Sequence, residues 1–480
     1  MRLAPLPCLV LILSGCAHEP APPPKPTAVA PPVQPVAASP VADTTPLPPA
    51  SFTIPVDSYT LSNGLRVVLS RDTTAPVAVV GVYYHIGFRI EPRNRTGFAH
   101  LFEHMMFQGS ENLGKLGFFR LVQSNGGVLN GSTRFDFTNY YELIPSNVLQ
   151  TVLWAEADRM RSLKVTQENL VNQQGVVKSE VRVNVLNRPY GGWPWVIVPQ
   201  AANVNWYNAH NFYGDLTDLD AATLDEVQAF FKTFYAPNNA ALVVSGNFDP
   251  AQTKEWIARY FEGIPRANVP PLPDLTEPPQ TAERWKDVED KLAERPALAV
   301  AYHMPPRGSP EFWAMALLNQ ILVEGNDSRL YQELVQKRGI TGEVEGGVNL
   351  LGNQYNYQGP MLWMAYLIHD KDRAPKDVVA AIDAAIEPLR TTPIDAATLE
   401  RARVKARSAY FGNLERNNSF GRMDLLAANA LYDDDAAAVN RIEPHLLAVT
   451  PELIQRTAQE WLRPTNRTVV ALKAGKAGGK

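Results

Sequence analysis

A helix, turn and strand pattern occurs twice along the chain and limits the folds open to it. The stretch that begins Thr223-Leu-Asp-Glu-Val-Gln and ends Ala-Ala-Leu-Val-Val has a counterpart that begins at Thr450. Thr450 follows Thr223, and Pro464 follows Pro237, by the same 227 positions, so the two stretches align without a gap. We interpret the pattern as duplication of one α+β unit; chance similarity of two helix–turn–strand units is the alternative.

A proline-rich stretch divides the chain between the two copies. A chain of 480 residues is long enough for two or more domains. Because residues 266–280 are proline-rich and irregular, we place a linker at 266–285. The linker separates an N-terminal domain at 56–265 from a C-terminal domain at 286–475.

Local patterns predict elements within these domains. Asn63-Gly64 predicts the turn of a β-hairpin. Helical periodicity predicts a long helix at 167–186, and a strand is expected at 355–368.

Residues 1–16 are typical of a bacterial lipoprotein signal. Arg2 is a short basic region, and residues 9–13 form an apolar core that is too short to span a bilayer. Cys16 then stands where such signals are lipidated; an ordinary secretory signal that contains Cys16 is the alternative. By resemblance to lipoprotein sorting, Ala17 favours an outer-membrane anchor facing the periplasm, with the lipid as the only membrane attachment.

The residues after the signal cannot form a core. Residues 17–55 are rich in proline and alanine, and we expect a disordered tether. The only two cysteines, Cys8 and Cys16, lie in the signal, so the folded part has no disulfide and no thiolate site. A net charge of −4 gives no indication of nucleic-acid binding.

Residues 97–107 predict a short helix that carries ionisable side chains, with Thr96 as its N-cap. His100 and His104 share one helical face, and Glu103 points the same way. Imidazoles bind zinc, and zinc lowers the pKa of a bound water to about 7, so a nearby carboxylate can take its proton. The order His-x-x-Glu-His is the inverzincin signature. Two core histidines are the alternative, but burying three such groups without a cation or partners would cost several kcal/mol.

Over residues 56–475 the chain resembles the pitrilysin, insulin-degrading enzyme and mitochondrial processing peptidase family. The likeness is carried by Gly87, Glu91 and the run Thr96-Gly97-x-Ala99-His100-x-x-Glu103-His104-Met105-x-Phe107-x-Gly109. It implies an α+β fold of two homologous α/β-sandwich halves, each an antiparallel-rich sheet with helices packed on one side.

The resemblance also implies a ligand set and a general base. His100 and His104 would bind zinc (Zn²⁺), with Glu103 as the general base. The family's third ligand is a glutamate in a later helix. Glu180 fits, with 75 positions between it and His104, although a solvated helix glutamate is the alternative for Glu180 taken alone.

Residues 127–140 resemble the family's strand segment near the metal, whose edge pairs with an extended peptide. Asn130 and Thr133 are therefore candidate substrate-binding residues, through β-augmentation. Asn130 could equally be a turn residue. His210 stands where the family often has His-Pro-Tyr, and a structural role is favoured over a ligand role.

The second half departs from the family pattern. Active single-chain relatives carry an arginine and a tyrosine that reach the substrate carbonyl, and Val335 and Gly342 stand at these positions. Neither can donate a side-chain hydrogen bond, and losing such a donor costs on the order of 10²–10³ in rate. Arg329 or Arg338 could stand in, but we do not expect it.

These observations predict a zinc metalloendopeptidase subunit that cleaves peptides or unfolded polypeptides in an enclosed chamber. A homologous subunit without zinc ligands would supply the missing pair, giving a heterodimer. The alternatives are a peptide-binding or assembly subunit with little turnover, and a chain active alone as a homodimer.

Overall fold

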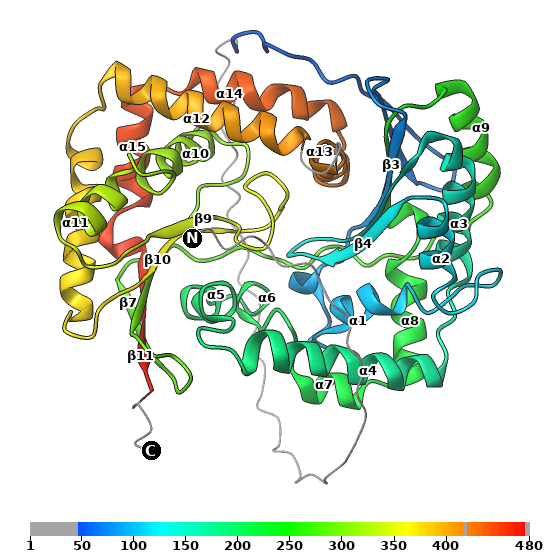
Figure 1. The fold of residues 1–480 in the computed structure, drawn as a ribbon, viewed down its shortest axis with the longest axis horizontal. Coiled ribbons are helices and arrows are strands. Elements are labelled where there is room, and N and C mark those ends of the chain that lie inside the picture. Colours follow the sequence, from blue (N-terminus) through cyan, green and yellow to red (C-terminus); the bar gives the residue numbers. More distant parts are fainter. Residues whose placement is uncertain (1–46, 416–419, 476–480) are drawn as a thin grey trace. The chain divides into compact units, whose positions relative to one another are not determined.

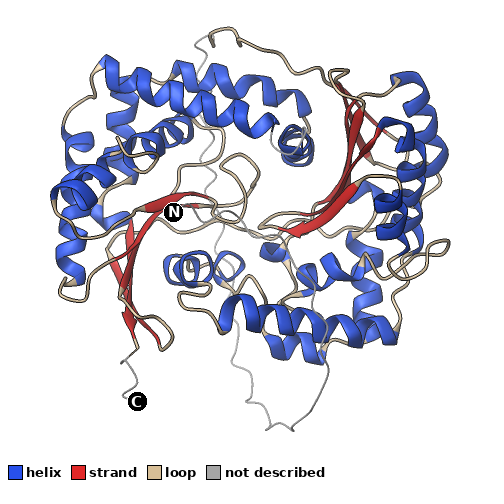
Figure 2. Cartoon of the chain, in the orientation of Figure 1, coloured by secondary structure: helices blue, strands red, loops and turns tan. Residues whose placement is uncertain are grey.

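The computed structural model describes residues 47–415 and 420–475. The strands form two sheets, and helices pack on both of them (Figures 1 and 2). The predicted signal segment, Cys16 and most of the predicted tether lie outside the described residues. None of the described helices is both long enough and apolar enough to cross a membrane.

The first sheet has six strands in the order β1-β2-β6-β3-β5-β4. Only the β2–β6 pair is parallel, and the Asn63-Gly64 turn joins β1 to β2 as predicted. The strands are β1 (Asp57–Thr60), β2 (Arg66–Arg71), β3 (Val77–Tyr84), β4 (Val128–Thr133), β5 (Thr138–Pro145) and β6 (Ala240–Gly246).

The second sheet repeats five of these strands in the order β7-β11-β8-β10-β9, again with one parallel pair, β7–β11. Its strands are β7 (Arg284–Asp290), β8 (Ala297–His303), β9 (Glu345–Val348), β10 (Leu362–Ile368) and β11 (Arg467–Ala474). The helices before β6 and β11, α8 (Leu224–Phe234) and α15 (Pro451–Trp461), are 227 positions apart. The predicted α+β fold of two homologous halves is therefore confirmed.

The remaining described helices are connected to these strands in each half, and their number differs between the halves. In the first half they are α1 (Phe98–Met105), α2 (Gly117–Ser124), α3 (Leu149–Ser162), α4 (Gln167–Val181), α5 (Val198–Ala202), α6 (Trp206–Ala209), α7 (Leu216–Ala221) and α9 (Pro250–Phe261). In the second half they are α10 (Pro310–Leu322), α11 (Pro375–Thr391), α12 (Ala396–Glu415), α13 (Phe420–Tyr432) and α14 (Ile442–Ala448). The predicted helix at 167–186 continues past α4 as a π-helical segment, Arg182–Leu186.

The first sheet is apolar on both faces because successive side chains along its strands point alternately into two hydrophobic cores. Val67 and Leu69 join the core beneath α3 and α8, whereas Val68 and Val79 join the core that contains α13. At Gly81 an added Cβ would lie 2.2 Å from Met423 Sδ, so α13 packs closely on β3. Figure 1 shows α13 on the face of this sheet opposite α2, α3 and α9.

The second sheet receives the reciprocal cover from the first half. Trp193, which precedes α5, and Val198, the first residue of α5, pack with Ala299 and Ala301 of β8. Each half therefore covers the second face of the other half's sheet. The prediction placed helices on one side only; the additional helix on each sheet comes from the partner half, which a half's own pattern does not reveal.

Three predicted boundaries differ from the structure. The strand predicted at 355–368 begins only at Leu362, because the preceding loop bonds to the first half: Gln358 N donates to Asp136 Oδ2 (2.7 Å). The predicted disordered tether extends too far, because Ser51 N donates to Glu443 Oε2 (2.7 Å) and buried Ile54 bonds to Asn440. Residues 265–283 contain no helix or strand, and β7 begins inside the predicted linker.

Candidate zinc site

A buried carboxylate caps helix α1, which carries the His-x-x-Glu-His motif. Glu91 Oε2 accepts from Gly97 N (2.8 Å) and Oε1 accepts from Ala99 N (2.6 Å). The prediction of Thr96 as the N-cap is wrong: Gly97, with φ +87°, takes that position, and Thr96 Oγ1 donates to Asp218 (2.7 Å). A carboxylate offers two acceptor oxygens to the free N–H groups, whereas a threonine offers one. Burial raises the pKa of Glu91.

The structure brings together the three side chains predicted to bind zinc. Nε2 of His104 lies 3.2 Å from Glu180 Oε2, and Nε2 of His100 lies 3.9 Å from the same oxygen. Tetrahedral zinc with bonds of about 2.0–2.1 Å separates its ligand atoms by roughly 3.3 Å. The two distances bracket that value, so this donor set fits zinc with one open position. No other group of three such side chains lies this close within the described residues.

Burial and the neighbouring charges shift the pKa values of all three candidate ligands. Burial lowers the pKa of His100, and the neighbouring His104 lowers it further. Burial opposes protonation of His104, but Glu180 and Glu103 outweigh it and raise its pKa. Burial opposes ionisation of Glu180, but the two imidazoles outweigh it and lower its pKa. The carboxylate therefore stays ionised beside both ring nitrogens.

Glu103 stands beside this cluster and is oriented by strand β4. Thr133 Oγ1 lies 2.9 Å from Glu103 Oε2 and 3.3 Å from Ala99 O, so its single proton is donated to the nearer carboxylate. Thr133 is only 2% exposed, so the prediction that it binds substrate gives way to a role in orienting Glu103.

Asn130 lies on β4, and the alternative of a turn residue is wrong. Its side chain is exposed, with Oδ1 accepting from Gly131 N (2.9 Å). β4 forms the edge of the first sheet, where backbone groups are open to pairing with another strand.

The segment that follows α6 packs on the N-terminus of α1. His210 is outside the ligand cluster: its Nε2 lies 2.7 Å from Phe88 O and its Nδ1 3.1 Å from Trp206 O, as a structural role requires. Three residues after His210, the ring of Tyr213 packs edge to face on the His100 ring, with centroids 5.7 Å apart and an interplanar angle of 63°. No sequence pattern singles out Tyr213; the only signal is its place three positions after His210.

A buried polar network supports α1 from the sheet side. Tyr140 on β5 donates to Phe102 O (2.9 Å), and the Arg159 guanidinium lies over the Tyr140 ring at 4.6 Å. Arg159 also pairs with two buried carboxylates, Glu156 and Glu142. Burial raises the pKa of Glu142 well above its usual range, and the Glu156 charge adds to this effect, while Arg159 opposes it.

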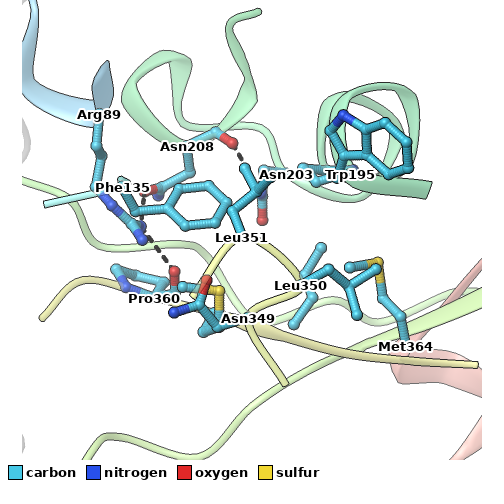
Figure 3. Close-up of a pocket in the computed structure, with 13 residues that line it drawn as sticks. Arg89, Phe135, Trp195, Asn203, Asn208, Asn349, Leu350, Leu351, Pro360 and Met364 are labelled. Carbon is cyan, nitrogen blue, oxygen red and sulfur yellow. Dashed lines mark hydrogen bonds between the residues drawn. The ribbon is translucent and has the colours of Figure 1, made fainter. Parts of the chain in front are cut away.

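A small cavity lies between the two halves (Figure 3). Its volume is about 10 Å³, roughly the room for one water molecule. Arg89 reaches it, with Nη1 donating to Asn208 Oδ1 (2.6 Å) and Pro360 O (2.7 Å) and Nε 2.7 Å from Asp136 Oδ1. Sequence reasoning missed this buried ion pair, which joins the motif-bearing half to the loop before β10.

Neither Arg329 nor Arg338, the two arginines considered as replacements for the missing donors, points to the candidate zinc site through a contact of the described residues. Arg338 Nε lies 2.5 Å from Glu333 Oε1 in an exposed ion pair, and Arg329 lines an open cleft beside α11. Both belong to the helical layer of the second sheet, and the segment that contains Val335 packs on α11. The expectation that neither arginine replaces the missing donors agrees with these positions.

Comparisons with known proteins agree with the two halves. Residues 66–188, which contain all three candidate ligands, match the "Insulinase (Peptidase family M16)" model, and residues 221–405 match "Peptidase M16 inactive domain". A Helicobacter pylori protein named zinc protease PqqE is 26% identical over 424 residues, which are 87% of this chain and 92% of that protein.

Solved structures show the same fold. A protease from Helicobacter pylori superposes with a TM-score of 0.80 at 26% identity, covering 88% of this chain and 100% of that one. An M16 inactive domain from Pseudomonas fluorescens has a TM-score of 0.76 at 16% identity, covering 89% and 99%, and this likeness concerns the fold alone.

The fold and the site define a two-half α+β protein with an inverted His-x-x-Glu-His site on its first half. The chain belongs to the M16 peptidase family. Similar proteins from Helicobacter pylori and Streptomyces coelicolor are named zinc proteases.

Proposed function

We propose that the chain is the zinc-bearing subunit of a metalloendopeptidase that hydrolyses peptides or unfolded polypeptides. The observation that carries the proposal is the convergence of His100, His104 and Glu180 beside the oriented carboxylate of Glu103. Two imidazoles and one carboxylate are a common ligand set of catalytic zinc.

The side chains of the site would have separate roles in peptide hydrolysis. Zinc, when bound by the three ligands, would polarise a peptide carbonyl and make water acidic enough to ionise near neutral pH. Glu103 takes the proton of the attacking water and then delivers a proton to the leaving amine nitrogen. Thr133 keeps the Glu103 carboxylate in place while this happens.

The exposed edge of β4 suits an extended peptide. We propose that substrate adds to this edge as a strand, so that backbone hydrogen bonds hold it and Asn130 contacts a side chain. A partly folded protein could present such a strand only after local unfolding, which favours unfolded substrates.

We further propose a homologous partner subunit without zinc ligands. The support is the absence of side-chain donors at Val335 and Gly342, together with the engagement of Arg338 by Glu333. Facing half-shells would enclose a chamber. A peptide-binding or assembly subunit with little turnover is the second candidate, favoured by the same missing donors.

One experiment separates these functions. Cleavage of a quenched fluorescent peptide is measured for this chain alone and mixed with a homologous subunit from the same source, with zinc content determined in parallel. We expect zinc in the chain alone, cleavage mainly in the mixture, and loss of cleavage with Glu103→Gln. Equal cleavage by the chain alone would exclude the need for a heterodimer and favour a homodimer. Zinc without cleavage in either state would favour the binding subunit.

We propose a periplasmic location with a lipid on Cys16, supported by the sequence of the signal segment. Cells grown with radiolabelled palmitate should incorporate the label into the wild-type protein, and the labelled protein should sediment with the outer membranes. Cys16→Ala should lose both label and sedimentation; retained label would contradict the proposal.

A further inference from the structure

Tyr213 occupies the space next to the candidate zinc ligands. Its ring contacts the His100 ring edge to face, with centroids 5.7 Å apart, and it is half-buried. It belongs to the first half, so its position does not depend on a second subunit.

Backbone packing fixes Tyr213 against helix α1. The next residue, Gly214, has φ +76°, and an added Cβ would lie 2.4 Å from Gly97 N, so the turn lies directly on the helix N-terminus. Asp215 N donates to Thr96 Oγ1 (2.8 Å), which ties the other side of the turn to the same place. The tyrosine ring is therefore held at a set position relative to His100.

The Tyr213 phenol lies within electrostatic range of Glu180 and Glu103, the two carboxylates of the proposed zinc site, and packs in one cluster with Trp195. A tyrosine hydroxyl can donate one hydrogen bond.

We propose that Tyr213 is a catalytic residue whose hydroxyl donates a hydrogen bond to the substrate carbonyl oxygen as negative charge develops on it. This inference rests on the proposed peptidase function. Tyr213 would then supply, from the zinc-bearing half, one of the two donors that the second half lacks at Val335 and Gly342. A partner subunit would need to add only the positive charge.

The test is Tyr213→Phe, which keeps the ring and removes the hydroxyl, with Tyr207→Phe on α6 as the matched control. We expect kcat/KM to fall by about 10²–10³, the usual effect of removing one oxyanion donor. Binding of a phosphinic peptide, a mimic of the tetrahedral adduct, should weaken by a similar factor in calorimetry. Zinc affinity and thermal stability should stay at the wild-type level, as should all properties of Tyr207→Phe.

Each outcome has a separate meaning. Unchanged phosphinic-peptide binding by Tyr213→Phe would overturn the inference and leave the peptidase function intact. Loss of zinc affinity in the variant would assign Tyr213 a structural role and also overturn it. Failure of the peptidase function would appear instead in the wild-type chain, as phosphinic-peptide binding that does not require zinc.

Discussion

Thr133 Oγ1 lies 2.9 Å from Glu103 Oε2, so a buried hydroxyl on strand β4 orients the carboxylate that helix α1 presents to the candidate zinc site. The contact joins the strand whose edge we propose for substrate to the residue proposed as the general base. Substrate position and proton transfer would thus depend on the same element.

Replacing Thr133 by valine should slow catalysis without removing zinc. A hydrogen bond to a charged group contributes about 1.5–3 kcal/mol, which corresponds to about a 10-fold to 100-fold fall in kcat. Thr133→Ser keeps the hydroxyl and should stay close to wild type. Peptide-cleavage kinetics with zinc analysis would check this, and wild-type kcat for Thr133→Val would show that the hydroxyl is not needed.

Gly214→Ala should destabilise the fold and loosen the zinc site. The new Cβ would lie 2.4 Å from Gly97 N, at a backbone φ of +76°. The left-handed conformation alone costs an alanine about 1–2 kcal/mol, and the backbone contact adds to it. Gly175→Ala on α4 is the control, because its Cβ would meet no atom within 4 Å and alanine favours helices by about 1 kcal/mol. Urea unfolding measures both; equal stability of the two variants would refute the close packing.

Asp136→Asn should be far more damaging than loss of an exposed ion pair. Arg89 and Asp136 are both nearly fully buried, with Nε 2.7 Å from Oδ1, so the variant leaves a buried guanidinium uncompensated. Breaking such a pair costs about 3–5 kcal/mol. Asp434→Asn, which removes the exposed partner of Arg66, should cost less than about 1 kcal/mol. Similar denaturation midpoints for the two variants would contradict a role for Arg89 and Asp136 in joining the halves.

Glu142→Gln should change how stability depends on pH. Burial raises the pKa of Glu142 in the folded chain above that of a glutamate in the unfolded chain. Between these two pKa values the folded chain keeps a proton that the unfolded chain has released. The free energy of unfolding of the wild type therefore falls as the pH rises from the lower value to the higher one. The amide has no proton to release, so the variant should gain stability relative to wild type between pH 5 and pH 8, a range of about three units. Urea unfolding across this range measures the difference, and parallel curves would mean that Glu142 is ionised in the fold.

The metal ligands could be predicted because they depend on local geometry and a family spacing. His100 and His104 are one helical turn apart, and the 75 positions to Glu180 correspond to a later helix that packs along α1. The duplication was visible because its copies align without a gap, and the strand orders of the two sheets agree with it.

The long-range contacts could not be predicted from single segments. Glu91 replaces Thr96 at the helix N-terminus because chain folding brings a buried carboxylate there, and no local pattern distinguishes it from a surface glutamate. Thr133 was assigned to substrate because strand alternation does not say what lies behind the strand. The cover of each sheet by a helix from the other half requires the assembled chain.

The proposed peptidase chemistry requires that His100, His104 and Glu180 together bind one zinc ion. Zinc titration against a chromophoric chelator tests it most directly, with Glu180→Gln compared to Glu168→Gln, an exposed glutamate on the same helix. We expect one zinc per chain, with equal affinity for wild type and Glu168→Gln. The affinity of Glu180→Gln should be at least about 100-fold weaker, since loss of even an outer partner costs about 10–100-fold. Wild-type zinc affinity in Glu180→Gln would contradict this requirement.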